Sequence, residues 1–109
     1  MKYMMLIYAG VDAPPDPEML PKHQAFAEEI GRRGTLVAAG ELSDLSMATT
    51  VRRSGQELLI TDGPHAETKE YIGGYYIVDC ADLDQALEIA SRLPLDPGGA
   101  AEVRPLVER

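Results

Sequence analysis

The chain has 109 residues, of which 45% are hydrophobic, so it is long enough for one globular domain over residues 1–109 that folds without metal or disulfide cross-links. Its formal net charge is −8. This acidic balance argues against sequence-independent binding to nucleic acids, which requires a basic face, and against binding to anionic membrane surfaces.

The first part of the chain predicts a strand, a helix and a second strand. Residues 2–8 form a short apolar run, rich in aromatic and branched side chains, which is typical of a central strand. Because a proline inside a helix removes a hydrogen bond, we expect the main helix to begin at Pro21. Gly34 is typical of the position just after a helix, and residues 35–41 predict the second strand.

The rest of the chain predicts four more strands and one helix. The strands are expected at residues 49–53, 56–61, 72–79 and 101–105. Ser54-Gly55 predicts a two-residue hairpin turn between the first two of these. Asp82 and Gln85 have the spacing of a capping box, which indicates a helix start. Gly73-Gly74 weakens its strand unless a bulge, a dimer contact or a ligand requires it.

This element order predicts an α+β fold. With the hairpin treated as an insertion, the order is the ferredoxin-like βαββαβ pattern, an antiparallel sheet with two helices on one face. The other face of the sheet then needs a cover, and the chain has no further element to supply it. A second copy, packed sheet against sheet, is the natural cover. We therefore expect a homodimer through the sheet face.

Six short motifs in register resemble one known family. They are "KYMMLIY" near the start, "ATTVR" at 48–52, "TDGP" at 61–64, "ETKE" at 67–70, "GGYY" at 73–76 and "EVRP" at 102–105. Together they resemble the YCII-related proteins, and in particular the DGPF-domain subgroup, named for an Asp-Gly-Pro-Phe signature. The resemblance spans essentially the whole chain. It implies a dimeric α+β barrel, in agreement with the element order.

The resemblance also implies a pocket and two kinds of role. The parent family pairs a histidine of the first helix, matched by His23, with an aspartate that precedes a proline, and a relative acts as a dehydrochlorinating lyase. Members of the DGPF subgroup are often encoded near extracytoplasmic-function sigma factors. This sequence departs from the family twice, because His65 replaces the signature Phe and Leu93 replaces the paired aspartate.

His23 and Asp62 are the candidate catalytic residues. An imidazole titrates near neutral pH, so His23 could act as a general acid or base; the alternative is a partly buried histidine bonded to a backbone group. Asp62 could supply the carboxylate that Leu93 does not and orient His23. The alternative is that Asp62, which precedes Gly-Pro, serves as a turn residue.

Four further residues are candidates for substrate binding: Arg52, His65, Tyr75 and Tyr76. Arg52 would bind an anionic or carboxylate substrate if it reached a pocket mouth, and would otherwise lie on the surface. His65 could line the cleft as a base or ligand, but we expect its ring to pack, as the family's Phe would. Tyr75 and Tyr76 point to opposite faces of their strand, so one of them either donates a hydrogen bond in the barrel or packs in the core.

The sequence contains no recognisable motif for a metal or an organic cofactor. Its two histidines and one cysteine are far apart, and it lacks a phosphate loop, a dinucleotide fingerprint and a serine-nucleophile motif. Cys80 has no basic neighbour in the sequence to make it reactive, and a lone cysteine suits a reducing cytoplasm. We expect no metal and no cofactor.

Three classes of function are consistent with these features. The first is a cofactor-independent enzyme that uses His-based acid/base chemistry on a small molecule. The second is a non-enzymatic ligand-binding or regulatory module, linked to extracytoplasmic-function sigma-factor signalling. The third is a purely structural dimer, which the rigid "TDGP" loop makes the least favoured of the three.

Overall fold

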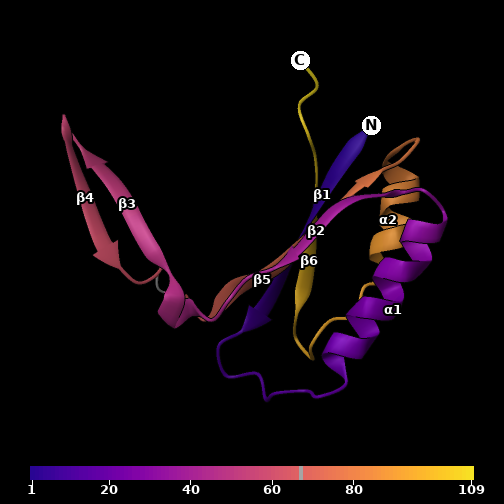
Figure 1. The fold of residues 1–109 in the computed structure, drawn as a ribbon, viewed down its shortest axis with the longest axis horizontal. Coiled ribbons are helices and arrows are strands. Elements are labelled where there is room, and N and C mark those ends of the chain that lie inside the picture. Colours follow the sequence, from indigo (N-terminus) through magenta and orange to yellow (C-terminus); the bar gives the residue numbers. More distant parts are fainter. Residues whose placement is uncertain (67) are drawn as a thin grey trace.

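The computed structural model describes residues 1–66 and 68–109, so Glu67 of the "ETKE" motif lies outside the described residues. It contains a four-stranded antiparallel sheet in the order β2-β5-β1-β6. The strands are β1 (Lys2–Gly10), β2 (Leu36–Glu41), β5 (Glu70–Asp79) and β6 (Ala100–Pro105). Two helices, α1 (Met19–Arg32) and α2 (Leu83–Ala90), lie together on one side of this sheet (Figure 1). The predicted ferredoxin-like α+β fold is confirmed.

The predicted elements agree closely with the observed ones, with one instructive difference at α1. Both ends of every strand lie within two residues of the predicted ends. Pro21, however, is the third residue of α1 and not its first, because the helix begins at Met19. The first four N–H groups of a helix have no partner within it, so a proline at this position removes no hydrogen bond. The expectation that the helix starts at Pro21 was therefore wrong.

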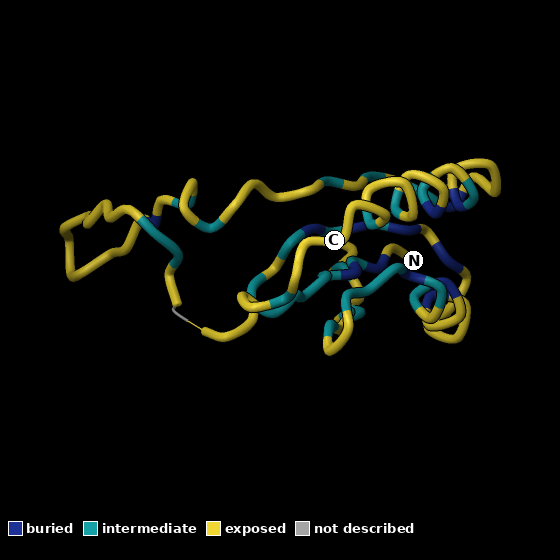
Figure 2. Tube along the Cα trace, turned by 90° about the horizontal axis from the view of Figure 1, so that it is seen from below, coloured by how far each residue is buried: buried dark blue, intermediate teal, exposed yellow. Residues whose placement is uncertain are grey.

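The hydrophobic core lies between the sheet and the two helices. Alternate residues of the central strands point toward the helices, and Met5 and Val78 are fully buried there. Ile30 of α1 and Ile89 of α2 meet them from the other side. Figure 2 shows most of the buried residues in the part of the molecule formed by the sheet and the two helices. Among the helices of the described residues, none is long and apolar enough to cross a membrane.

The opposite face of the sheet is apolar as well, although both helices lie on the other side (Figure 1). Residues directly opposite each other in an antiparallel pair share one face of the sheet. Met4 lies opposite Ile77, and Leu6 lies opposite Tyr75. These four side chains alternate with the buried ones and are only partly shielded from solvent. We call this surface the helix-free face.

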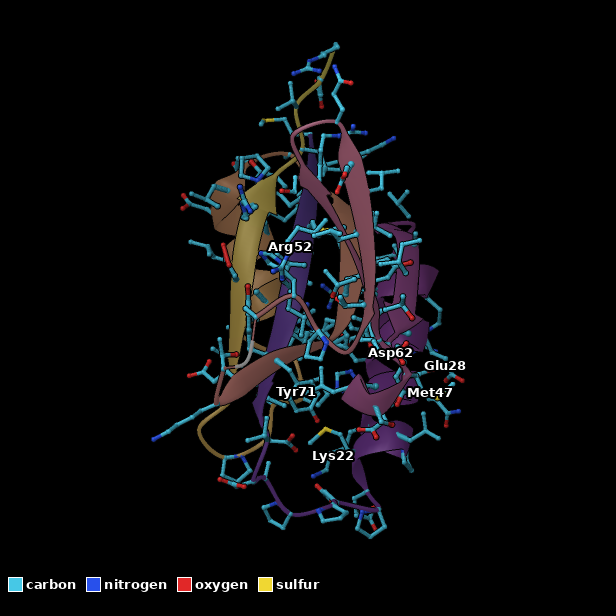
Figure 3. The ribbon with its side chains drawn as sticks, turned by 90° about the vertical axis from the view of Figure 1, so that its left-hand side faces the viewer. Lys22, Glu28, Met47, Arg52, Asp62 and Tyr71 are labelled. Atoms are coloured by element: carbon cyan, nitrogen blue, oxygen red, sulfur yellow. The ribbon has the colours of Figure 1, made fainter. Side chains whose placement is uncertain are left out.

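Two strands stand apart from the sheet as a separate hairpin. They are β3 (Thr49–Ser54) and β4 (Glu57–Asp62), and they follow the 3-10 turn η1 (Leu45–Met47). We call residues 49–62 the arm. Its strands pair with each other and contact the rest of the molecule little. Figures 1 and 3 show that the arm stands in front of the helix-free face, on the side away from the helices.

The "TDGP" motif closes the base of the arm. The backbone N–H of Gly63 donates to the carbonyl of Ala48 at 2.8 Å, and the hydroxyl of Thr50 donates to the carbonyl of Gly63 at 2.6 Å. Gly63 has a φ of 102°, a backbone conformation that side chains other than glycine rarely adopt. The motif therefore fixes the point at which the arm leaves the sheet.

The Gly73-Gly74 pair is explained by a bulge and a close approach within the chain. Ile7 pairs with Gly74 and Tyr8 with Ile72, so Gly73 is the extra residue of a β-bulge. A Cβ atom on Gly74 would lie 2.9 Å from the carbonyl oxygen of Gly40 on the neighbouring strand. Because that obstacle is backbone, it cannot swing away.

We predict that Gly74→Ala destabilises the protein by about 1–3 kcal/mol, as overpacking in a filled site does. Gly73→Ala is the control, because the nearest atom to its added Cβ is a Tyr71 ring carbon at an ordinary 3.8 Å. Urea unfolding of both variants measures the difference. Equal stabilities for the two variants would contradict the close approach at Gly74.

Candidate functional site

A cavity of about 610 Å³ lies where the first turns of α1 meet the sheet. Its walls come from α1, from the end of β2 and the chain that follows it, from β5 and from the loop after α2. The lining includes His23, Tyr75 and Tyr76, three of the six site residues predicted from the sequence. A second, smaller cavity of about 400 Å³ lies beside Pro64 and Tyr71 near the base of the arm.

His23 and Tyr76 form the centre of the larger cavity. Nδ1 of His23 lies 2.9 Å from the Tyr76 hydroxyl, and the two rings are stacked with centroids 5.9 Å apart. Phe26 packs edge-on against the Tyr76 ring, with 5.2 Å between the ring centroids. Because His23, Phe26 and Ile30 are three and four residues apart, they share the buried face of α1. The histidine thus continues a helix stripe that is otherwise core.

Burial decides the protonation of this pair. It lowers the pKa of His23 below its ordinary value, while the carboxylates of Glu41 and Asp96 and a hydrogen bond to the Pro94 backbone partly oppose the shift. Burial also raises the pKa of Tyr76, which keeps its hydroxyl protonated. With the phenol protonated and the imidazole neutral, the Tyr76 hydroxyl can donate to Nδ1 of His23, and the tautomer of the imidazole sets the direction of this hydrogen bond. This geometry presents a proton donor and a proton acceptor side by side.

The structure answers which tyrosine faces the helices. Tyr76 is buried on the helix side, next to His23. Tyr75 points to the other face of β5, where its ring covers Gly40 so closely that an added Cβ there would lie 2.8 Å from a ring carbon. Tyr75 nevertheless also lines the cavity, at the sheet edge formed by β2.

The other three predicted site residues lie outside this cavity, on or beside the arm. The Arg52 guanidinium is 3.4 Å from Nδ1 of His65, and both side chains are exposed. Asp62 is the last residue of β4, and its side chain is also exposed. Figure 3 shows Arg52 and Asp62 on the arm, in front of the sheet. A single chain therefore does not bring Asp62 to His23.

Two carboxylates that the sequence reading did not single out lie near His23 instead. Both Glu41, the last residue of β2, and Asp96, in the loop after α2, line the cavity and act on the pKa of His23. Leu93, at the position of the family's paired aspartate, belongs to the hydrophobic core. Asp96 follows Pro94 by two residues, so the sequence does show a carboxylate near the position of the family's paired aspartate. The sequence alone did not connect this carboxylate to His23.

We predict that the free energy of unfolding falls as the pH drops below about 6.5, in part because of His23. The unfolded chain takes up a proton at this residue near its ordinary pKa, whereas burial resists that proton in the folded protein. His23→Gln should remove this contribution, so the stability of the wild type relative to the variant should decrease toward acid. Urea unfolding at several pH values measures it, and a difference independent of pH would contradict it.

Comparison with known proteins agrees with the motifs and the fold. The family model of the YCII-related domain matches residues 1–109. An uncharacterised protein of Rhizobium meliloti (strain 1021) is 45% identical over 93 residues, which cover 84% of this chain and 75% of that protein. With the ferredoxin-like sheet, the helix histidine in its cavity and these matches together, the chain belongs to the YCII-related family.

Proposed function

We propose that this protein is a cofactor-independent enzyme that moves a proton on a small molecule in the His23–Tyr76 cavity. The observation that carries the proposal is the 2.9 Å contact between Nδ1 of His23 and the Tyr76 hydroxyl at a partly buried cavity wall. A neutral imidazole can accept a proton, and a protonated phenol beside it can donate one. The cavity is large enough for a small organic molecule.

In this proposal the two residues have distinct roles. His23 is the base, and its Nδ1 becomes available to a ligand when the Tyr76 hydroxyl turns to donate to that ligand instead. Glu41 and Asp96 stabilise the imidazolium that forms, since both favour the charged form of His23. They take the place of the family's paired aspartate, which is Leu93 here. Asp62 could orient His23 only from a second chain.

We predict that His23→Gln lowers the rate of the proton transfer by about 10²–10⁴-fold, the usual contribution of a positioned acid or base. Tyr76→Phe should lower it too, because the phenyl ring keeps its packing against Phe26 but loses the donor. Tyr75→Phe is the matched control, since it removes a hydroxyl that does not contact His23. Solvent deuterium exchange into a panel of small C–H acids, followed by NMR, measures the rates. Catalysed exchange that survives His23→Gln would contradict the assignment.

The second candidate is a ligand-binding or regulatory module, linked to extracytoplasmic-function sigma-factor signalling as in the DGPF subgroup. It is favoured by one observation, namely that the family's paired aspartate is absent and Asp62 does not replace it within the chain. In that case compounds of the same panel should raise the melting temperature of the protein, but the protein should not catalyse the exchange of their protons for deuterium. Binding that moves the NMR signals of His23, without turnover, supports this second function.

We also propose a homodimer through the helix-free face. Met4, Leu6 and Ile77 make that face apolar. On the arm, the apolar residues Val51 and Ile60 are 62% and 70% exposed. A two-stranded hairpin is marginally stable by itself in water. A second chain packed on the helix-free face would also lie within reach of the arm, because the arm stands in front of that face (Figure 3). Arg52, Asp62 and His65 would then approach the partner.

We predict that the wild type elutes at twice the mass of one chain and that Leu6→Lys converts it to a folded monomer. A lysine on the central strand of the helix-free face can extend into water in the monomer but not within an apolar interface. Leu87→Lys adds the same charge to the exposed side of α2 and should leave the dimer intact. Light scattering with circular dichroism measures both properties. A monomeric wild type at micromolar concentration would contradict the proposal.

A further inference from the structure

The arm carries an apolar stripe on one of its two faces. Residues directly opposite each other in an antiparallel hairpin share a face, and Val51 lies opposite Ile60. Leu58 is two residues from Ile60 along β4, so its side chain lies on that face too. The exposed fractions of Val51, Ile60 and Leu58 are 62%, 70% and 57%. We call these three side chains the arm stripe.

The arm stripe has no cover within the described part of its own chain. All residues of β4 are exposed, and β3 and β4 contact each other extensively but other elements little. The hydrogen bonds of Gly63 at the base of the arm fix where it leaves the sheet. A two-stranded hairpin is marginally stable by itself, and a contiguous apolar patch on a protein surface marks an interaction site. The arm stripe therefore needs a cover from outside its own chain.

The arm and the helix-free face are both neutral, although the chain as a whole is acidic. The arm has two positive and two negative side chains, which are Arg52, Arg53, Glu57 and Asp62. The rows of the helix-free face that pass through residues 2–8 of β1 are balanced in the same way by Lys2, Asp79, Glu102 and Arg104. The net charge of −8 therefore comes from other parts of the molecule. Because like charges repel, two copies of an acidic chain meet most easily on surfaces that are neutral.

We propose that the arm of each chain clasps the second chain of a homodimer, with the arm stripe packed against the partner. This proposal rests on the homodimer proposed above and adds the arm to its interface. Because the arm stands in front of the helix-free face, a chain that covers this face lies within reach of the arm (Figure 3). A twofold axis repeats the contact, so each chain covers the arm stripe of the other. One partner then covers both apolar surfaces that a single chain leaves open.

Two adjacent leucines of β4 provide a matched test. Leu58 belongs to the arm stripe, whereas Leu59 lies on the other face of the arm and is 44% exposed. Leu58→Glu places a carboxylate opposite Arg53, and Leu59→Glu places one opposite Arg52, so neither puts like charges across the hairpin. Leu58→Glu should raise the Kd of the dimer at least about tenfold, because a carboxylate loses its water in an apolar contact and each dimer contains two. Leu59→Glu should change the Kd by less than about threefold.

Sedimentation over a range of protein concentrations measures these Kd values, and hydrogen exchange measures the order of the arm. In the wild-type dimer, the backbone N–H groups of the arm should exchange at least about tenfold more slowly than in the Leu6→Lys monomer, because a hairpin without a partner is marginally stable. The N–H groups of α2, which lies on the other side of the sheet, are the internal reference (Figure 1). They should exchange at similar rates in the two proteins.

The outcomes separate the clasp from the homodimer on which it rests. If Leu58→Glu and Leu59→Glu weaken the dimer equally, the arm stripe is not the contact, and the proposal is wrong. If neither weakens it, the homodimer stands without the clasp. Slow exchange of the arm in the Leu6→Lys monomer would also contradict the clasp, because the arm would then be ordered without a partner. A monomeric wild type would contradict the homodimer and the clasp together.

Discussion

The packing of Tyr76 between α1 and the sheet is the contact on which the fold and the site both depend. Its ring meets Phe26 edge-on and stacks beside His23, and its hydroxyl reaches Nδ1 of that histidine. The contact anchors the N-terminal half of α1 over β5. It also shields His23 from water, which is the main reason for the lowered pKa of the imidazole. Core packing thus favours the neutral form of the imidazole.

Two glycines without side chains shape the sheet edge beside this contact. Gly40 gives room to the ring of Tyr75, and Gly74 lets the backbone of β2 approach β5 closely. The bulge at Gly73 interrupts the regular pairing of β5 with β1 at the same level. Side chains at these positions would fill or distort the wall of the cavity. The glycine pair therefore has a structural explanation within one chain and requires no ligand.

Charge is distributed unevenly between this site and the arm. The cavity gathers carboxylates around a neutral histidine, whereas Arg52 and Arg53 both lie on the arm. The arm also carries Glu57 and Asp62, so its formal charge is zero. Its exposed apolar side chains, Val51 and Ile60 among them, distinguish it from the acidic cavity. The backbone bonds around Gly63 hold the arm apart from the cavity within one chain.

The sequence by itself determined the order of strands and helices along the chain and the family, because periodicity, caps and turn residues act over a few neighbouring residues. The spacing of three and four residues between His23, Phe26 and Ile30 also indicates that this histidine shares a helix face with two core residues. Only the tertiary structure decided which side chains surround that histidine. Glu41 and Asp96 come from distant segments that meet only when the sheet forms, and Asp62 lies on a hairpin that leaves it. Local sequence patterns do not predict such contacts, because the contacts depend on where whole helices and strands pack.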